Sequence, residues 1–386
     1  MTEWRKVKLG DICSIKSGKR LPKGADFSSC PTENKYIRAR DIKNGVINGE
    51  DLAFISNEVK ERISKYIVNT NDVIVTIAGT IGEVAFVTSQ YDGVNLTENA
   101  IRLTDFDHEV NSKYVFYTLR SNDYYEYMQK IAGGAAQPKM GIYKVEAISI
   151  ALPSIDTQER IVDILSRYDA LIENYQRQIK LLEEAAQRLY KEWFVDLRFP
   201  GHQSTPIINN LPQSWQKKKL GEIAEFKRGK TITKKDIIEG VVPVVAGGLE
   251  PAYYCNKSNT DKRVVTVSGS GANAGFTRMY FEKVWASDCS FVDCSSTRYL
   301  HFVYCFLIAN KSSLDVMQKG SAQPHVYAKD INAMDILVPP FNVLDSFERE
   351  ASKLFDVIAS RNNQIRNLSE ARDRLLPKLM SAEIVV

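Results

Sequence analysis

A segment near the start of this chain occurs a second time near its middle. Trp4–Ile12 (WRKVKLGDI) matches Trp215–Ile223 (WQKKKLGEI), and further on Gly134–Pro138 (GAAQP) matches Gly320–Pro324 (GSAQP). Between these two anchors the second copy is shorter and its sequence has diverged. Repeats this long indicate a duplicated domain, because solenoid repeats are only about 20–45 residues long. The 386-residue chain is therefore predicted to contain two similar units.

Each copy ends in a segment with the periodicity of a coiled coil. After Pro153, Asp156 and Glu159 have the spacing of a helix capping box, and apolar residues then alternate three and four positions apart. Such a narrow stripe needs a partner helix to cover it. The candidate helix-pairing residues are Leu165, Tyr168, Ile172, Tyr175, Ile179, Leu182 and Leu189 in the first copy, and Leu354, Ile358, Ile365, Leu368 and Leu375 in the second.

Three residues disturb the stripe of the second copy. Arg361 and Arg372 interrupt it with charge, and Pro377 is predicted to fray or kink the helix because proline removes a backbone hydrogen bond. The simplest arrangement that buries both stripes is an antiparallel pair of the two long helices, which makes the molecule pseudo-twofold. The alternative is that each helix packs on its own globular domain.

Short strand-like runs and turns fill the globular part of each copy. Asp72–Ile77 and Arg263–Val267 are predicted to be buried strands, and Tyr114–Leu119 and Phe302–Leu307 short helices. The predicted fold class is α+β, with two similar globular domains joined by two long antiparallel coiled-coil helices as an internal repeat. The predicted boundaries are 1–155 and 199–341 for the globular domains, and 156–198 and 342–386 for the helices.

Composition excludes several classes of protein. Hydrophobic residues make up 44% of the chain and charged residues 25%, as in a soluble globular protein. No apolar run approaches the ~20 residues that span a membrane, and the first residues lack the apolar core of a signal peptide, so a cytoplasmic location is expected. The six cysteines form no CxxC pair and the four histidines have no metal-ligand spacing, so neither a disulfide framework nor a metal site is expected.

Two segments only resemble catalytic motifs. Gly269–Ala274 (GSGANA) has the pattern of a dinucleotide-binding loop, but a strand-like run follows it where that site needs a helix. Pro339–Phe341 resembles the end of the NPPF motif of adenine methyltransferases, but Val338 stands in place of the asparagine. The sequence also contains no P-loop and no hydrolase triad signature. We therefore expect a recognition or scaffold protein with no catalytic residues.

Basic residues cluster at corresponding places in both copies, within residues 1–24 and 214–236. Such clusters can bind a polyanion, although solvated surface charge is the alternative interpretation. Two similar modules at a fixed separation suit a ligand with two similar sites, and the grooves of duplex DNA recur about every 34 Å. Double-stranded DNA is therefore the predicted ligand.

The duplication sorts the candidate DNA-binding residues by role. Residues shared by both copies cannot distinguish two different half-sites, so they are expected to contact phosphates or fix the backbone, and residues that differ are the candidate base readers. The candidates are Lys16, Lys19, Arg20, Arg38, Arg40, Thr80, Asn99, Gln137 and Lys139 in the first copy, and Lys227, Arg228, Lys230, Lys234, Ser270, Asn273, Arg278, Gln323 and His325 in the second. The alternative for Gln137 and Gln323 is a turn before proline, and for the others an ordinary surface role.

The helix ends and domain starts carry a resemblance to a known family. Leu189–Gly201 (LYKEWFVDLRFPG) resembles the end of the central conserved region of type I restriction–modification specificity (S) subunits, and Arg374–Ile384 (RLLPKLMSAEI) resembles the C-terminal one. Trp4–Ile12 and Trp215–Ile223 resemble the usual start of a target recognition domain in that family. Ile155–Ile161 (IDTQERI) resembles the family's helix start, whereas the second copy departs from it there.

The resemblance implies that each globular domain is a target recognition domain reading one half of a bipartite DNA target, with the helix pair setting the unread gap. It implies two methyltransferase (M) subunits docked on the helices, which carry S-adenosylmethionine, and two restriction (R) subunits that use ATP and magnesium. No cofactor and no metal is expected on this chain, and the complex is expected in the prokaryotic cytoplasm. Two alternatives stay open: a coiled-coil scaffold with two ligand-binding modules, and a DNA enzyme with an unrecognised site.

Overall fold

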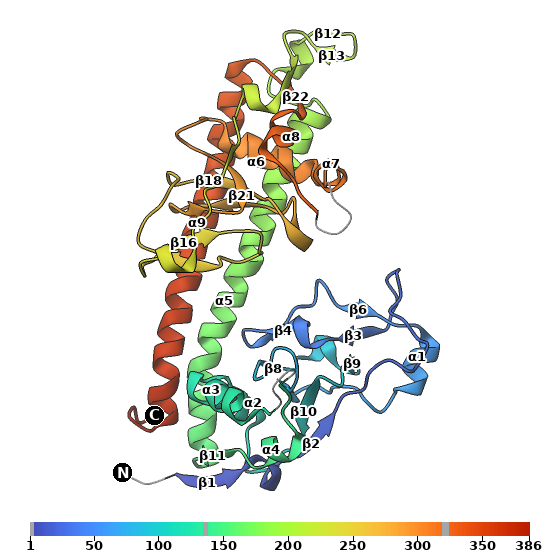
Figure 1. The fold of residues 1–386 in the computed structure, drawn as a ribbon, viewed down its shortest axis with the longest axis vertical. Coiled ribbons are helices and arrows are strands. Elements are labelled where there is room, and N and C mark those ends of the chain that lie inside the picture. Colours follow the sequence, from blue (N-terminus) through green and yellow to red (C-terminus); the bar gives the residue numbers. More distant parts are fainter. Residues whose placement is uncertain (1–3, 134–137, 319–323) are drawn as a thin grey trace. The chain divides into compact units, whose positions relative to one another are not determined.

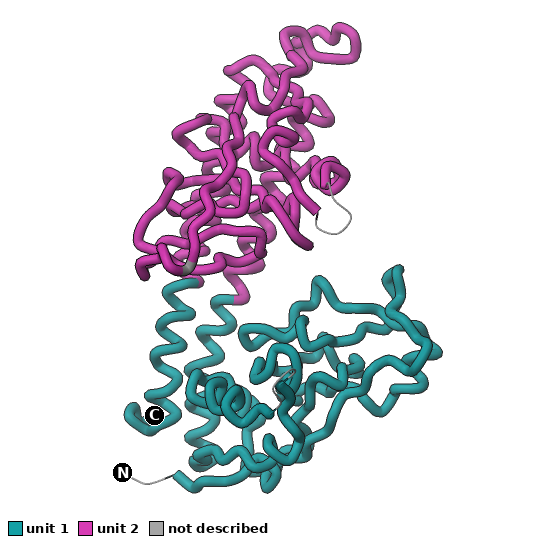
Figure 2. The backbone as a smooth tube through the Cα atoms, viewed as in Figure 1, with its two compact units in different colours: residues 1–172, 366–386 teal, residues 173–365 magenta. Residues whose placement is uncertain are grey.

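The computed structural model describes residues 4–133, 138–318 and 324–386 (Figure 1). The chain forms two compact units: unit 1 contains residues 1–172 and 366–386, and unit 2 contains residues 173–365 (Figure 2). Two long helices, α5 (Ile155–Tyr190) and α9 (Phe341–Met380), contribute to both units. Each unit therefore combines one globular domain with a segment of each long helix.

Unit 1 is built around a four-stranded antiparallel sheet in the order β2-β10-β7-β8. A smaller sheet has the order β6-β3-β9, in which β3 and β9 are parallel. The strands are β1 (Arg5–Lys8), β2 (Ser14–Ser17), β3 (Lys35–Ile37), β4 (Ile42–Lys43), β5 (Val46–Ile47), β6 (Ala53–Phe54), β7 (Val73–Thr76), β8 (Val84–Phe86), β9 (Asn95–Leu96), β10 (Ala100–Thr104) and β11 (Ser149–Leu152). The helices are η1 (Leu9–Asp11), η2 (Ala39–Asp41), α1 (Asn57–Arg62), η3 (Ser89–Tyr91), α2 (Ser112–Arg120), α3 (Asn122–Ile131) and α4 (Ile142–Glu146).

Unit 2 repeats this plan. Its antiparallel sheet has the order β15-β21-β18-β19, and its smaller sheet has the order β17-β16-β20 with β16 and β20 parallel. The strands are β12 (Ile207–Ile208), β13 (Leu211–Pro212), β14 (Gln216–Lys219), β15 (Lys227–Arg228), β16 (Val242–Val245), β17 (Tyr253–Cys255), β18 (Val264–Ser268), β19 (Thr277–Tyr280), β20 (Trp285–Ala286), β21 (Cys289–Asp293) and β22 (Asp335–Val338). The helices are η4 (Lys191–Val195), η5 (His202–Ser204), η6 (Leu220–Glu222), η7 (Lys234–Asp236), η8 (Gly271–Asn273), α6 (Leu300–Ala309), α7 (Lys311–Val316) and α8 (Ala328–Asn332).

The predicted internal repeat is confirmed in the sheets. In both units the strand that begins the repeat pairs antiparallel with the last strand, β1 with β11 and β14 with β22. The shorter length of the second copy arises mainly between β3 and β9, where residues 38–94 correspond to the shorter stretch 246–284. Unit 1 uses part of this extra length for the β4–β5 hairpin, whose turn residues Asn44 and Gly45 both have positive φ, as a tight hairpin turn requires.

The central strands β7 and β18 are buried on both faces, which explains their largely apolar sequences. In β7, Val73 and Val75 face a core that also contains Tyr114 and Tyr117 of α2, whereas Ile74 faces a second core on the other side of the sheet. In β18, Val265 and Val267 likewise join the core of α6, and Val264 faces away from it. Both predicted strands and both predicted short helices are confirmed.

The two long helices pair antiparallel, as predicted, and they pack on the globular domains as well. In unit 1, Ile161 and Leu165 of α5 share a buried core with Leu376 and Leu379 of α9. In unit 2, Ile179, Leu182 and Leu189 of α5 pack against a core that contains Phe347, Ala351, Phe355 and Ile358 of α9. The same two cores include α2 and α6, so each helix segment is held from two sides.

Two details of the helix ends differ from the prediction. Asp156 was expected to cap α5, but it lies in the first turn, and the helix starts after Ser154, whose Oγ lies 3.1 Å from Thr157 Oγ1. Pro377 was expected to fray or kink α9; the helix does not fray there and continues to Met380. Leu376 and Leu379 on either side of this proline are buried, so packing holds the last turn although proline lacks the backbone donor.

The segment Leu189–Gly201 at the end of α5, which resembles the central conserved region of specificity subunits, has a packing role. Trp193 and Phe194 lie in a π-helical turn, η4, and are buried in the core of unit 2. The Phe194 ring centroid lies 4.8 Å from that of Phe302 and 4.9 Å from that of Phe347, joining η4 to α6 and α9. Phe199 packs on Trp215 at 4.9 Å. This motif therefore stabilises unit 2.

Candidate nucleic-acid interface

Several predicted DNA-binding residues of unit 1 meet at the hairpin turn between β7 and β8. Thr80 Oγ1 donates a hydrogen bond to the carbonyl oxygen of Ala39 at 3.3 Å, which brings the turn against Arg40. The backbone N–H of Ile77 donates to the carbonyl oxygen of Asn99 at 2.8 Å, and Ala78 forms a β-bridge with Lys139. We call Arg40, Thr80, Asn99 and Lys139 hairpin site 1; Gln137, two residues before Lys139, lies outside the described residues.

The corresponding hairpin between β18 and β19 gathers the candidates of unit 2. Ser270 forms a β-bridge with His325, and its Oγ donates to Asp288. Asn273 Nδ2 donates to the carbonyl oxygen of Gly247 at 3.4 Å. We call Ser270, Asn273 and His325 hairpin site 2; Gln323 lies outside the described residues. The two sites have the same place in the two sheets but present different side chains.

The glycine shared by both copies is explained by backbone packing. A Cβ atom on Gly18 would lie 2.1 Å from the carbonyl oxygen of Thr97, and one on Gly229 would lie 2.3 Å from that of Ser287. The next residues, Lys19 and Lys230, hold the same contact by donating backbone hydrogen bonds to Leu96 and Ala286. This close approach fixes the strand that carries the shared basic residues.

We predict that Gly18→Ala and Gly229→Ala each lower the free energy of unfolding by about 1–3 kcal/mol or more, because the added methyl group overlaps backbone atoms that cannot rotate away. The measurement is the urea unfolding midpoint of each purified variant. Gly133→Ala is the control, since its Cβ would meet only Lys144 Nζ at 3.4 Å. Unfolding midpoints equal to that of the unmodified chain would show that these glycines are not needed for packing.

The basic residues on β2 and directly after it are exposed, and two of them lie next to acidic partners. Lys16 Nζ lies 2.6 Å from Asp105 Oδ2, and Arg20 Nε lies 3.1 Å from Glu98 Oε1. The hydrogen bond from Lys16 lowers the pKa of Asp105 below its ordinary value. Lys19 Nζ lies 5.5 Å from the ring centroid of Tyr66. In unit 2, Lys227, Arg228 and Lys230 are exposed, and Lys234 begins η7.

Two arginines proposed as base readers are engaged within their own domains. Arg38 donates from Nε and Nη2 to the two carboxylate oxygens of Asp41 at 2.9 and 2.8 Å, and only 20% of its side chain is exposed. Arg278 donates to the carbonyl oxygen of Leu249 at 2.9 Å and lies over the Tyr280 ring at 5.0 Å. Asp41 and Tyr280 lie only three and two residues along the chain from these arginines, whereas only the fold brings the carbonyl oxygen of Leu249 to Arg278.

A polar cluster interrupts the helix pair in unit 1 at the position of Arg372. Its Nη1 donates to Asp169 Oδ1 at 2.6 Å, and Arg120 Nη1 lies 3.5 Å from the same oxygen. The Tyr117 hydroxyl donates to Asp169 Oδ2 at 2.7 Å. Burial, together with Asp169, raises the pKa of Tyr117 above its usual range, so the hydroxyl remains a donor. In unit 2, Arg361 Nε donates to Gln178 Oε1 at 2.8 Å.

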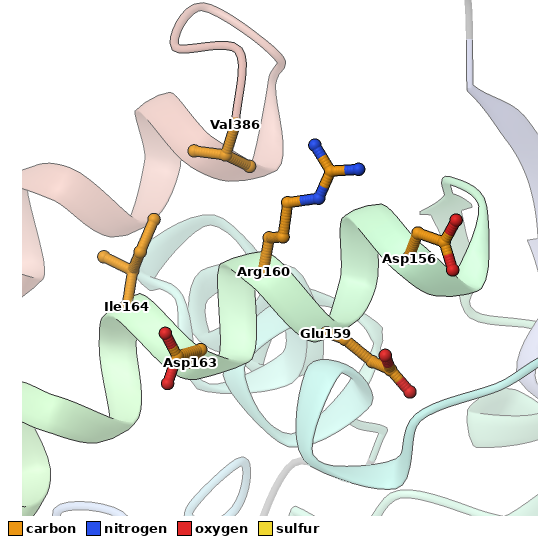
Figure 3. Close-up of a pocket in the computed structure, with 6 residues that line it drawn as sticks. All are labelled: Asp156, Glu159, Arg160, Asp163, Ile164 and Val386. Carbon is orange, nitrogen blue, oxygen red and sulfur yellow. The ribbon is translucent and has the colours of Figure 1, made fainter.

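A shallow hollow of about 580 Å³ at the start of α5 has the wrong charge for DNA. It is lined by Asp156, Glu159, Arg160, Asp163, Ile164 and Val386, and Arg160 and Ile164 point toward the segment of Val386 (Figure 3). Three carboxylates against one guanidinium would repel phosphate.

Among the residues that the structure describes, no group of three or more His, Cys, Asp and Glu side chains could hold a metal ion. Within the same residues, no helix is long and apolar enough to cross a membrane.

Comparison with known proteins connects both copies to one family. The type I restriction modification DNA specificity domain matches residues 1–184 and again residues 212–368. This chain belongs to the type I restriction–modification specificity family. It is 27% identical to the type I restriction enzyme MjaIX specificity subunit of Methanocaldococcus jannaschii over 303 residues, which is 72% of this chain and 70% of that protein. It is 21% identical to the HindI specificity subunit of Haemophilus influenzae over the whole length of both proteins.

The fold is also that of a solved specificity subunit. The type I restriction–modification S subunit from M. genitalium superposes with a TM-score of 0.55 at 18% identity, covering 97% of this chain and 96% of that one. The likeness includes nearly the whole chain. The predicted fold class, with two similar α+β domains and two long helices, is therefore that of the specificity family.

Proposed function

We propose that this chain is the sequence-reading subunit of a type I restriction–modification complex, in which residues 1–155 and 199–341 are two target recognition domains. Each would read one half of a bipartite duplex DNA target. The observation that carries this proposal is the pair of hairpin sites. They occupy the same place in two copies of one fold, yet the residue that forms the β-bridge to the hairpin turn is Lys139 in the first and His325 in the second. Equal scaffolds with different polar groups suit two half-sites of different sequence.

The shared basic residues are proposed to bind phosphates. Lys16, Lys19, Lys227 and Lys230 are exposed on the first strand of each main sheet or directly after it. Because they recur in both copies, they would hold the DNA without distinguishing its sequence. The base readers would then lie at hairpin sites 1 and 2, together with Arg20 and Lys234. Gln137 and Gln323 recur in both copies, so they would contact phosphates or fix the backbone. Arg38 and Arg278 could take part only by leaving their present partners.

The helix pair is proposed to set the unread gap and to dock two methyltransferase subunits. Leu171 and Leu181 on α5 and Val357 on α9 are exposed, which gives the helices apolar surface for partner helices. The methyltransferase subunits would supply S-adenosylmethionine, and two restriction subunits would supply the ATP- and magnesium-dependent steps. The chain itself is proposed to be non-catalytic and to carry no cofactor.

An exchange of one domain tests this assignment. We expect that replacing residues 1–150 with the corresponding region of another specificity subunit changes the bases of one block of the methylated target and leaves the other block and the gap unchanged. The readout is the N6-methyladenine pattern of a host that expresses the chimera with the methyltransferase whose gene lies next to that of this chain, called here the adjacent methyltransferase. The reciprocal exchange of residues 199–341 should change the other block. A chimera that altered both blocks, or neither, would contradict the two-domain assignment.

A further inference from the structure

An exposed aromatic ring occurs next to each hairpin site, but it comes from different sequence positions in the two units. Tyr143 on α4 is 69% exposed, and Tyr327, directly before α8, is 40% exposed. The helices α4 and α8 are equivalent, because each ends at a residue on which a glycine packs. A Cβ atom added to Gly10 would lie 3.0 Å from Cβ of Glu146, and one added to Gly221 would lie 3.0 Å from Cβ of Asn332. In this alignment Tyr327 corresponds to Gly141, and Tyr143 corresponds to Lys329.

The ring is attached at one position in unit 1 and at a different position in unit 2. A Cβ atom on Gly141 would lie 2.7 Å from Cε1 of Tyr143, so the Tyr143 ring covers the space in which a side chain at position 141 would start. In unit 2 the ring starts from that position instead, and Lys329 Nζ lies 5.8 Å from its centroid. The two copies have diverged at both positions but have each kept one exposed tyrosine. Such a compensated exchange indicates that the ring itself has a use.

The surroundings of both rings suit nucleic acid. Lys139 and His325 form the β-bridges to the two hairpin turns, so each ring lies a few residues along the chain from a hairpin site. His325 is stacked on Tyr327, with ring centroids 5.8 Å apart and planes 11° apart. Basic side chains beside an exposed, nearly flat aromatic surface are the arrangement that proteins use to pack on the sugars and bases of DNA.

We propose that Tyr143 and Tyr327 are a matched pair of DNA-contacting residues, each packing its ring on a deoxyribose or base of its own half-site. This inference rests on the proposed function. A ring contact releases no counterions, unlike a lysine on a phosphate. Loss of a ring should therefore weaken binding equally at all salt concentrations, whereas loss of Lys139 should also reduce the salt dependence of binding.

The test uses the complex of this chain with its adjacent methyltransferase and a fluorescent duplex that carries the mapped target. Tyr143→Ala and Tyr327→Ala should each weaken the dissociation constant by about 5- to 100-fold, with the slope of log K against log salt unchanged. Tyr143→Phe should keep most of the affinity. Lys139→Ala should reduce that slope by about one. Tyr127→Ala is the control: it removes from α3 a tyrosine that is 45% exposed, close to the 40% of Tyr327, and should leave the dissociation constant unchanged.

The sharpest variant moves the ring of unit 1 from position 143 to position 141, where unit 2 carries its tyrosine. Tyr143→Lys should lose affinity, and the double variant Gly141→Tyr with Tyr143→Lys, which copies the arrangement of unit 2, should regain it to within about threefold. Failure of this rescue, or unchanged affinity of both alanine variants, would overturn the inference while sequence-specific binding by the unmodified complex kept the proposed function intact. Variants that lose the methyltransferase but keep DNA affinity would show that the rings contact protein, which also overturns it. An unmodified complex without sequence preference would overturn both proposals.

Discussion

Replacing Asp169 with alanine should lower the free energy of unfolding by about 3 kcal/mol, at the lower end of the cost of breaking a buried ion pair because 29% of the Asp169 side chain is exposed. Its carboxylate accepts hydrogen bonds from Arg372 and Tyr117 and lies beside Arg120. Only 9% of the Arg372 side chain is exposed. Without Asp169, two guanidinium groups would face each other with too few acceptors. Asp373, 2.8 Å from Arg372 Nη2, remains and limits the loss.

The measurement is urea unfolding followed by the helical circular dichroism signal. Asp163→Ala is a matched control on the same helix, because Asp163 pairs with Arg167 at 2.6 Å but both side chains are largely exposed. Such a surface pair contributes only about 0.3–0.5 kcal/mol. Equal unfolding midpoints for the two variants would show that the polar cluster around Asp169 does not hold the helix pair together.

Removing one heptad from both long helices should change the length of the unread gap in the DNA target and leave both half-sites unchanged. The matched segments are residues 173–179 of α5 and 360–366 of α9, which include both members of the Gln178–Arg361 pair. A heptad keeps the stripes in register and turns a straight helix by only about 20°. It removes about 10 Å of helix, which corresponds to roughly three base pairs of duplex.

Mapping of N6-methyladenine gives the gap directly. Asp163→Ala, which leaves helix length unchanged, should give the same gap as the unmodified chain. A deletion variant that altered the bases within a block while keeping the gap would show that the helices do not set the spacing.

Much of the fold follows from the sequence because the repeat and the helix stripe are local signals. The run at Asp72–Ile77 predicted a buried strand, and the stripe through Leu165 and Ile179 predicted a helix that needs a partner. The stripe could not show which side chains of the second copy are buried most deeply. Phe355, Leu376 and Leu379 are more deeply buried than Leu354 and Leu375, because α9 packs on a globular domain as well as on α5.

The candidate site was predictable only in part. Thr80, Asn99 and Lys139 were chosen one at a time, and only the fold brings them together at one hairpin. Arg38 was chosen for its charge, but Asp41 holds it in a pairing that depends on the local backbone. Tyr143 and Tyr327 were missed, since a ring that moves from one position to another leaves no matching residue in an aligned repeat. The boundaries of the four predicted segments and the individual base readers stay predictions.

The most direct test of the central claim is the methylation pattern that this chain directs. We would express it with its adjacent methyltransferase in a host free of DNA methylation and map N6-methyladenine by long-read sequencing. We expect one new motif made of two short blocks around a gap of fixed length. If the complex forms and the methyltransferase is active with another specificity subunit, absence of any new motif would contradict the recognition role, and a single undivided block would contradict the two-domain account.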